Sequence, residues 1–221
     1  MVRGLFVTGT GTSVGKTVVS AALMLRYRRD LSLRYWKPIQ TGIEADDDTA
    51  EVARMAACTP DELFTSGIRL KTPVSPHLAA RLSGETIALQ PLIDRMHDAA
   101  DTRTWIVEGA GGALVPINDT QLMTDLMTMV ALPVVVAAHS TLGTINHTLL
   151  TLEALRHRAL RPAAVVMVGP PDAENRRAIE HYGHIPVVGQ LPRLEPLTTE
   201  GLSAWVATEF DRDGCLLEVM R

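Results

Sequence analysis

A glycine-rich segment near the N-terminus carries residue types that bind phosphate. It reads Gly9-Thr10-Gly11-Thr12-Ser13-Val14-Gly15-Lys16-Thr17, and it stands between a predicted strand, Leu5 to Val7, and a helical pattern from Lys16 to Arg29. Glycines let backbone N–H groups turn toward phosphate oxygens, and a helix N-terminus adds the positive end of its dipole. Lys16 would supply a point charge, and Thr17 a hydroxyl for Mg²⁺. The spacing is one residue longer than the usual pattern, but the strand-loop-helix context predicts a phosphate loop.

Two further charged residues stand at the ends of predicted strands. Lys37 follows the strand Leu33 to Trp36, and Glu108 closes the strand Thr104 to Val107. Because the carboxyl ends of parallel strands border the ligand crevice, both side chains should face the phosphates. Lys37 would hold a second anion, although by position alone it could simply mark the end of a strand. Glu108 would need a cation, since a buried carboxylate is costly without one.

An acidic run, Asp46-Asp47-Asp48, lies in the loop after Lys37. One of these carboxylates, with Thr17 and Glu108, would give the oxygen-rich shell that Mg²⁺ prefers. The residues alone do not choose among the three, and such a triplet can also be merely solvated.

A last segment, Leu142 to His147, opens a predicted helix. The free N–H groups at the start of that helix could hold a carboxylate. We expect His147 to be an ordinary residue of the helix face rather than a catalyst.

Strands and helices alternate along the whole chain. The remaining predicted strands are Pro133–Ala137, Ala163–Val168 and Val187–Gly189, and the remaining predicted helices are Asp48–Cys58, Ile87–Ala100, Thr144–Arg158, Glu174–Tyr182 and Gly201–Glu209. Thr59 to Ser83, rich in Thr, Ser and Pro, should be a loop with short elements. The alternation predicts the α/β class: a mostly parallel, twisted sheet of about seven strands with helices on both faces, in one domain over residues 1–221.

Composition narrows the classes of function. The 221 residues are 46% hydrophobic but only 4% aromatic, which predicts an aliphatic core. A net charge of −4 with interspersed signs argues against a nucleic-acid binder. We expect neither a signal peptide nor a membrane span. Cys58 and Cys215 lack any paired spacing and are expected to be reduced thiols, in the cytoplasm.

Taken together, these segments resemble the dethiobiotin synthetase family, which has the phosphate-loop NTPase fold. The similarity runs from Leu5 to about Leu160 and more weakly to Pro192. Five stretches match in order and spacing: Val7 to Thr17, Trp36 to Gly42, Pro73 to His77, Val107 to Gly112 and Leu142 to His147. The resemblance implies a homodimeric cytoplasmic ligase of biotin biosynthesis, which joins CO2 to 7,8-diaminononanoate with ATP and Mg²⁺.

The resemblance also implies roles for single residues. Lys37, Lys16 and Thr12 would be catalytic and would contact a carbamate or the phosphates. Thr17, Asp48 and Glu108 would hold Mg²⁺, with Asp46 and Asp47 as competitors for Asp48. The residues implied for the nucleotide are Gly11, Thr12, Ser13, Val14, Gly15, Lys16, Thr17, Gly169 and Pro192. Those implied for the substrate are Thr12, Lys37, Thr41 and Ser75, with Gly143, Thr144, Ile145 and Asn146 of the partner subunit.

One departure from the family concerns the nucleotide base. Family members commonly carry an Asn that reads adenine just after the strand Ala163–Val168, where this chain has Gly169-Pro170-Pro171. A glycine offers only backbone groups. We therefore expect the nucleotide to be held mainly through its phosphates and ribose, so that CTP, GTP or UTP could replace ATP.

Two other functions share part of these motifs. A partitioning-type switch ATPase has the same fold, but it carries a second lysine early in the phosphate loop, where this chain has Gly11. The synthetase half of a corrinoid amidotransferase is similar around Glu108 to Gly112. It needs a glutamine-hydrolysing domain with a nucleophilic cysteine, which we do not expect in a chain ending at Arg221.

Overall fold

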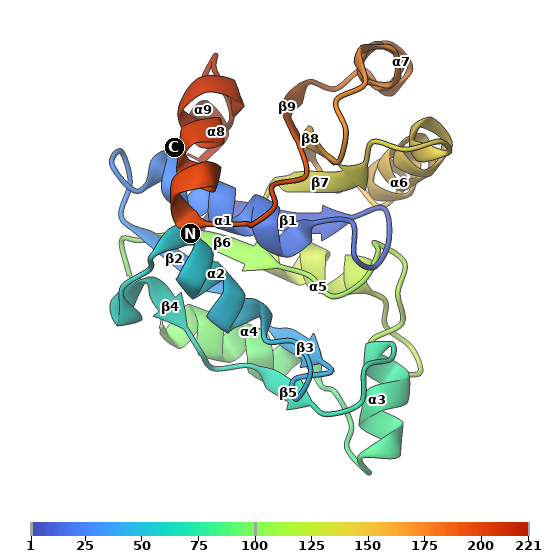
Figure 1. Ribbon diagram of the computed structural model, residues 1–221. Helices are drawn as coiled ribbons and strands as arrows, with labels where there is room; N and C mark the ends of the chain where they lie inside the picture. The colour runs from blue at the N-terminus through green and yellow to red at the C-terminus, as the bar shows by residue number, and fades with distance from the viewer. Residues whose placement is uncertain (1, 100, 221) are drawn as a thin grey trace.

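Parallel strands form the centre of the computed structural model, which describes residues 2–99 and 101–220. One sheet has seven strands, and all of its strand pairs are parallel. In spatial order the strands are β4 (Leu63–Phe64), β2 (Leu33–Trp36), β6 (Thr104–Glu108), β1 (Arg3–Gly9), β7 (Val134–His139), β8 (Pro162–Val168) and β9 (Val187–Leu191). The phosphate-loop strand β1 lies in the middle of the sheet (Figure 1). The predicted α/β class with a parallel sheet of about seven strands is confirmed.

Helices cover both faces of this sheet. One face packs against α1 (Lys16–Tyr27), α2 (Asp48–Ala56), α8 (Thr199–Glu209) and α9 (Cys215–Met220). The core of the other face includes α3 (Pro76–Leu82), α4 (Leu89–Asp98), α5 (Met123–Val130), α6 (Thr144–His157) and α7 (Ala173–Gly183). None of the helices in the described residues is long and apolar enough to cross a membrane.

Alternation along the buried strands divides the core into two layers. On β1, Leu5 and Val7 point into the layer beneath α1, whereas Phe6 points into the opposite one. Successive side chains of a strand face opposite sides, so a strand buried on both faces must be apolar throughout. This arrangement leaves the strand ends as the natural place for polar chemistry.

A second, two-stranded parallel sheet flanks the strand ends. It pairs β3 (Ile39–Thr41) with β5 (Ile68–Leu70), placing Gln40 opposite Arg69. Neither strand was predicted, because each is only three residues long and so is too short for a clear pattern. The loop expected over Thr59 to Ser83 also contains β4, α3 and a 3₁₀ turn at Pro60–Glu62.

Two short helices have no counterpart among the predicted elements, and several predicted element ends differ from those in the structure. The helices are α5 and α9, which have only eight and six residues. The helix predicted from Ile87 begins at Leu89, and its predicted end at Ala100 lies outside the described residues. These differences do not move the strand ends that carry Lys37 and Glu108.

Candidate active site

The phosphate loop connects the carboxyl end of β1 to the first turn of α1. Gly15 is the N-cap residue of α1, so the following backbone N–H groups have no partner within the helix. Lys16 is buried, and its Nζ donates to the carbonyl oxygen of Gly11 at 2.9 Å. Burial first, and then the neighbouring charge of Lys37, lowers the pKa of Lys16 to about 8, although Glu108 and Asp48 act in the opposite direction. The loop is therefore curled around a cation.

A second buried cation, Lys37, joins two carboxylates from distant parts of the chain. Its Nζ lies 2.5 Å from Asp48 Oδ2 and 2.8 Å from Glu108 Oε1, and it also donates to the carbonyl of Gly109. Burial alone would lower the pKa of Lys37, but the carboxylates of Glu108 and Asp48 outweigh that effect and raise it. Lys37 is thus a fixed positive charge at the end of β2.

Thr17 completes this cluster from the first turn of α1. Its hydroxyl donates to Asp48 Oδ1 at 2.7 Å and lies 3.2 Å from Glu108 Oε1. Tyr35 donates to the other oxygen of Glu108 at 2.9 Å, so both oxygens of that fully buried carboxylate have partners. The structure therefore brings together Thr17, Lys37, Asp48 and Glu108, each predicted as a site residue.

The acidic triplet divides into three different roles. The side chain of Asp47 caps α2 by accepting from the backbone N–H groups of Thr49 and Ala50. Asp46 lines a cavity beside the cluster. Burial and the negative charge of Asp48 raise the pKa of Asp46. Burial would also raise the pKa of Asp48, but the ammonium of Lys37 outweighs it and lowers that pKa. Only Asp48, of the three, contacts Thr17 and Lys37.

The donor atoms of this cluster suit a hard cation. Two carboxylates and one hydroxyl meet around Thr17, all of them oxygen ligands of the kind that Mg²⁺ prefers. Within residues 2–99 and 101–220 no group of three His, Cys, Asp or Glu side chains gathers at one point. A Mg²⁺ ion held here would keep positions for water and phosphate oxygens, as this ion usually does.

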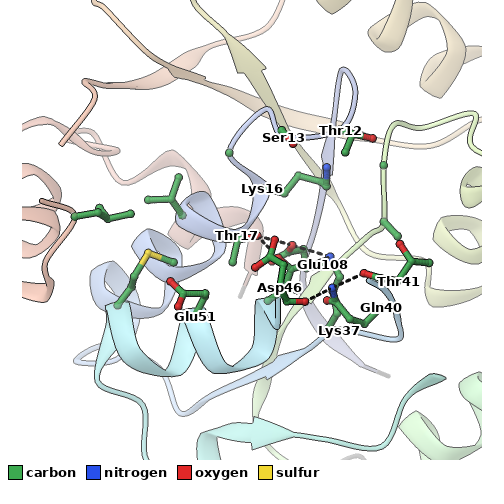
Figure 2. A pocket seen from close by; sticks show the side chains of 17 residues that line it. Thr12, Ser13, Lys16, Thr17, Lys37, Gln40, Thr41, Asp46, Glu51 and Glu108 are labelled. Atoms are coloured by element: carbon green, nitrogen blue, oxygen red, sulfur yellow. Dashed lines mark hydrogen bonds and ion pairs between the residues drawn. The ribbon is translucent and has the colours of Figure 1, made fainter. Parts of the chain in front are cut away.

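Two adjoining cavities open beside the cluster. The first, of about 420 Å³, is lined by Thr12, Ser13, Gly15, Lys16, Thr17, Val18, Lys37, Gln40, Thr41, Asp46, Asp48, Glu51, Met55, Glu108, Ala110, Gly111 and Leu197 (Figure 2). The second, of about 370 Å³, is lined by Ser75 and its neighbours, and it shares Thr12, Thr41 and Gly111 with the first. The shared residues make the pair one continuous binding region, with the phosphate loop at one end.

Several predicted residues lie elsewhere. Gly169 and Pro192 directly follow β8 and β9, and Gly143 to Asn146 open α6. These positions do not line either cavity, and neither does Val14, which is buried beneath the loop. Within one chain, the structure does not bring them to the cluster.

Other residues of the site were missed from the sequence. Tyr35 contacts Glu108, and the Nε2 atom of Gln40 donates to the carbonyl oxygens of Thr41 and Asp46 at 2.9 and 3.0 Å (Figure 2). Tyr35 looked like an ordinary strand residue. Gln40 lies next to the predicted Thr41, and its place in the same motif, Trp36 to Gly42, was the one available signal.

The chain is similar in sequence to a protein family and to several named proteins. Residues 3–201 match the family described as AAA domain. The chain is 43% identical over 205 residues to the ATP-dependent dethiobiotin synthetase BioD of Agrobacterium fabrum, with 93% of each protein covered. It is 47% identical to the biotin biosynthesis bifunctional protein BioCD of Bordetella avium, over 92% of this chain and 42% of that protein.

Comparison of structures supports the fold. MinD from Pyrococcus horikoshii, a septum site-determining protein, superposes with a TM-score of 0.56 at 14% identity, covering 100% of this chain and 95% of that one. A ParA family ATPase from Chlorobium tepidum gives 0.55 at 11% identity, covering 98% of each chain. Sequence identities this low show a shared fold and nothing more. With 42% identity over 95% of both lengths to a Brucella ovis relative of the same name, and the matches above, the chain belongs to the ATP-dependent dethiobiotin synthetase family.

Proposed function

We propose that this enzyme is a ligase of biotin biosynthesis that uses a nucleoside triphosphate to join CO2 to 7,8-diaminononanoate and close the ureido ring of dethiobiotin. The observation that carries the proposal is the contact of buried Lys37 with Asp48 and Glu108, directly beside the phosphate loop. A phosphate site and a second, shielded cation suit a reaction that handles two anions. The relatives named ATP-dependent dethiobiotin synthetase support the same reaction.

The reaction would proceed in three steps. An unprotonated amine of the substrate attacks CO2, forms a C–N bond and loses a proton, which gives a carbamate. A carbamate oxygen then attacks the γ-phosphorus, the nucleoside diphosphate leaves, and a carbamic-phosphoric anhydride forms. The second amine attacks the carbamoyl carbon and expels phosphate. Because that amine is tethered to the same molecule, positioning supplies much of the acceleration.

We assign the charges of this site to these steps. Lys37 and Lys16 would stabilise the carbamate and the transferring phosphoryl group, with Thr12 beside them. Mg²⁺, when held by Thr17, Asp48 and Glu108, would neutralise phosphate charge. Thr41 and Ser75 would contact the rest of the diamine in the second cavity, which they line. The backbone N–H groups of the loop would bind the β- and γ-phosphates.

A homodimer would complete the substrate site. Leu142 is fully exposed, and Leu114 and Leu150 are 48% and 55% exposed around an apolar groove that reaches Thr12 of the phosphate loop. An apolar surface of this kind is typical of an interface. A second copy seated here could bring Gly143 to Asn146 of the partner subunit to the substrate carboxylate.

The dimer has its own test. Leu150→Asp should convert the protein to a monomer in light scattering and abolish turnover, whereas Leu82→Asp, at an equally exposed position on α3, should do neither. A monomeric wild-type protein with full activity would contradict the proposed dimer.

The free thiols Cys58 and Cys215 support a reducing compartment, and we propose the cytoplasm.

Base selectivity is proposed to be weak. Gly169 stands where the family commonly has an Asn, so it offers no side chain to read adenine. The phosphates and ribose would then provide most of the nucleotide binding, and CTP, GTP and UTP should also support turnover. A nucleotide series in which ATP alone is active would reject this part of the proposal.

The main experiment incubates the protein with the diamine, labelled bicarbonate, Mg²⁺ and ATP, and measures acid-stable label. Label that requires both the diamine and the nucleotide is the expected result, and Lys37→Met should abolish it. Nucleotide hydrolysis that is indifferent to the diamine, without fixed label, would reject the synthetase. The partitioning-type switch ATPase would then become the better explanation.

A further inference from the structure

Arg69 contacts two of the four chain segments that supply the cluster of Thr17, Lys37, Asp48 and Glu108. Its Nη1 donates to the carbonyl oxygen of Lys37 at 2.9 Å, and its Nη2 lies 3.4 Å from the hydroxyl of Thr49. Thr49 directly follows Asp48 in the first turn of α2 and is itself buried. One guanidinium therefore joins the backbone of Lys37 to the helical turn that carries Asp48.

Gly67 provides the space for this contact. A Cβ at that position would lie 2.6 Å from Arg69 Nη1, 2.7 Å from the carbonyl oxygen of Lys37 and 2.9 Å from that of Pro38. Since atoms do not approach so closely, any side chain at residue 67 would displace the guanidinium or the backbone after β2. The glycine and the arginine thus work as a pair.

The surroundings of Arg69 suit a bridging role. Burial lowers its pKa, and the nearby Asp47, Tyr35 and Asp48 act in the opposite direction. Arg69 lines neither of the two cavities, so it has no direct route to a substrate. A planar guanidinium can donate to two partners in fixed directions, which the single ammonium of a lysine reproduces poorly.

We propose that Arg69 is a positioning residue that sets the spacing between Lys37 and Asp48. The inference rests on the proposed function, in which Lys37 holds the carbamate and Asp48 serves the phosphoryl transfer. In the structure the two side chains are 2.5 Å apart, and Arg69 contacts the backbone carbonyl of Lys37 and the side-chain hydroxyl of Thr49, the residue that follows Asp48. A displacement of about 1 Å at such a site can cost about a hundredfold in rate.

The test compares Arg69→Met and Arg69→Lys with wild type in the label-fixing assay. We expect kcat to fall about ten- to a hundredfold in both variants. The KM for nucleotide should stay within about threefold, because the hydrogen-bond partners of Arg69 among the described residues, Lys37, Ile68 and Thr49, lie outside the phosphate loop. Gly67→Ala should lower kcat in the same direction by displacing the same contact.

A matched control separates positioning from a general loss of structure. Arg176 on α7 also bonds a backbone carbonyl, that of Val187 at 2.9 Å, and pairs with Glu180. Arg176→Met should lose comparable contacts without changing kcat. A kcat for Arg69→Met within twofold of wild type would overturn the inference, as would kcat and nucleotide affinity falling together in proportion to Tm. A wild-type protein that fixes no label would reject the proposed function, and this inference with it.

Discussion

The hydroxyl of Ser140 fills the space into which a side chain at Gly169 would project. A Cβ on Gly169 would lie 2.5 Å from Ser140 Oγ, and Gly169 also has a φ of +128°, where other residues are strained. The two residues directly follow β7 and β8 at the carboxyl end of the sheet. A side chain at residue 169 would therefore compete with the Ser140 hydroxyl for the same space.

An asparagine at residue 169 should therefore be poorly tolerated by the fold. We expect Gly169→Asn to destabilise the protein by about 1–3 kcal/mol through backbone strain and the contact with Ser140. Ser140→Ala removes a buried hydroxyl that has no hydrogen-bond partner among the described residues, so it should be nearly neutral alone and should recover part of the loss in the double variant. Urea unfolding of the four proteins measures the coupling. Strictly additive effects would mean that the contact is not decisive.

Lys37 predicts an unusual response to magnesium. Its ammonium contacts the same two carboxylates, Asp48 and Glu108, that we assign to the metal. Lys37→Met leaves the buried carboxylate of Glu108 and the half-buried carboxylate of Asp48 without their cation, and breaking a buried ion pair typically costs about 3–5 kcal/mol. We expect the variant to unfold at a lower temperature in chelator and to gain more from Mg²⁺ than wild type does.

Calorimetry checks this without turnover. Mg²⁺ titrated into nucleotide-free protein should bind Lys37→Met more tightly than wild type, because no ammonium shares the carboxylate oxygens. Lys71→Met is the control, since Lys71 pairs with Glu44 on the surface. Equal Mg²⁺ affinities in wild type and Lys37→Met would argue against a metal at Asp48 and Glu108.

The sequence predicted the alternating architecture because its buried strands are apolar runs that end in distinctive residues. Val134 to Ala138, for example, is fully buried, while Lys37 directly follows β2 and Glu108 is the last residue of β6. The carboxyl ends of parallel strands lie at one edge of the sheet. Residues at those ends can therefore be predicted to lie close together even when they are far apart in sequence. That rule accounts for the predicted cluster.

What escaped prediction depends on tertiary contacts. Local spacing left the three carboxylates of the acidic run equivalent, and only the family resemblance favoured Asp48. In the structure Asp47 caps α2, and Asp48 in the first turn of that helix contacts Thr17 and Lys37. The pairing of Gln40 with Arg69 joins strands of three residues, too short to show a period. Neither fact is encoded in local spacing.

Cys58 and Cys215 should be poor nucleophiles in the folded protein. Burial raises the pKa of Cys58 to about 11, and burial together with Asp211 raises that of Cys215 to about 12. Because the thiolate is the reactive form, alkylation at pH 8 should be slower than in the unfolded chain, whose thiols have a pKa near 8.5, by about 10²-fold at Cys58 and about 10³-fold at Cys215. Reactivity should rise as the pH approaches 11.

Iodoacetamide labelling followed by mass spectrometry resolves the two sites. The same protein in urea supplies the matched control, since its thiols are exposed. Labelling of the folded protein at the unfolded rate would show that these segments open readily, contrary to the partial burial of Cys58 just after α2 and of Cys215 at the start of α9.

The last prediction concerns the anchor of the C-terminal helix. Asp211 is buried, and its carboxylate accepts from the hydroxyl of Tyr27 on α1 and from the backbone N–H groups of Cys215 and Leu216 at 3.1 Å each. Asp211→Ala leaves these donors without a partner, which should destabilise the protein by about 3 kcal/mol, given about 1–3 kcal/mol for each such group. Tyr27→Phe removes one donor and should cost less.

The contact between Tyr27 and Asp211 also makes the stability of the folded protein depend on pH. Burial, followed by the contact with Asp211, raises the pKa of Tyr27 far above its ordinary value of 10.0. Above about pH 10 the unfolded chain loses the phenol proton while the folded chain keeps it, so the folded state binds more protons and stability falls as pH rises. In Tyr27→Phe this contribution is absent, and the loss of stability from pH 9 to 11 should be smaller than in wild type. Urea midpoints measured across that range test the anchor, and parallel slopes for the two proteins would show that Tyr27 ionises freely when folded.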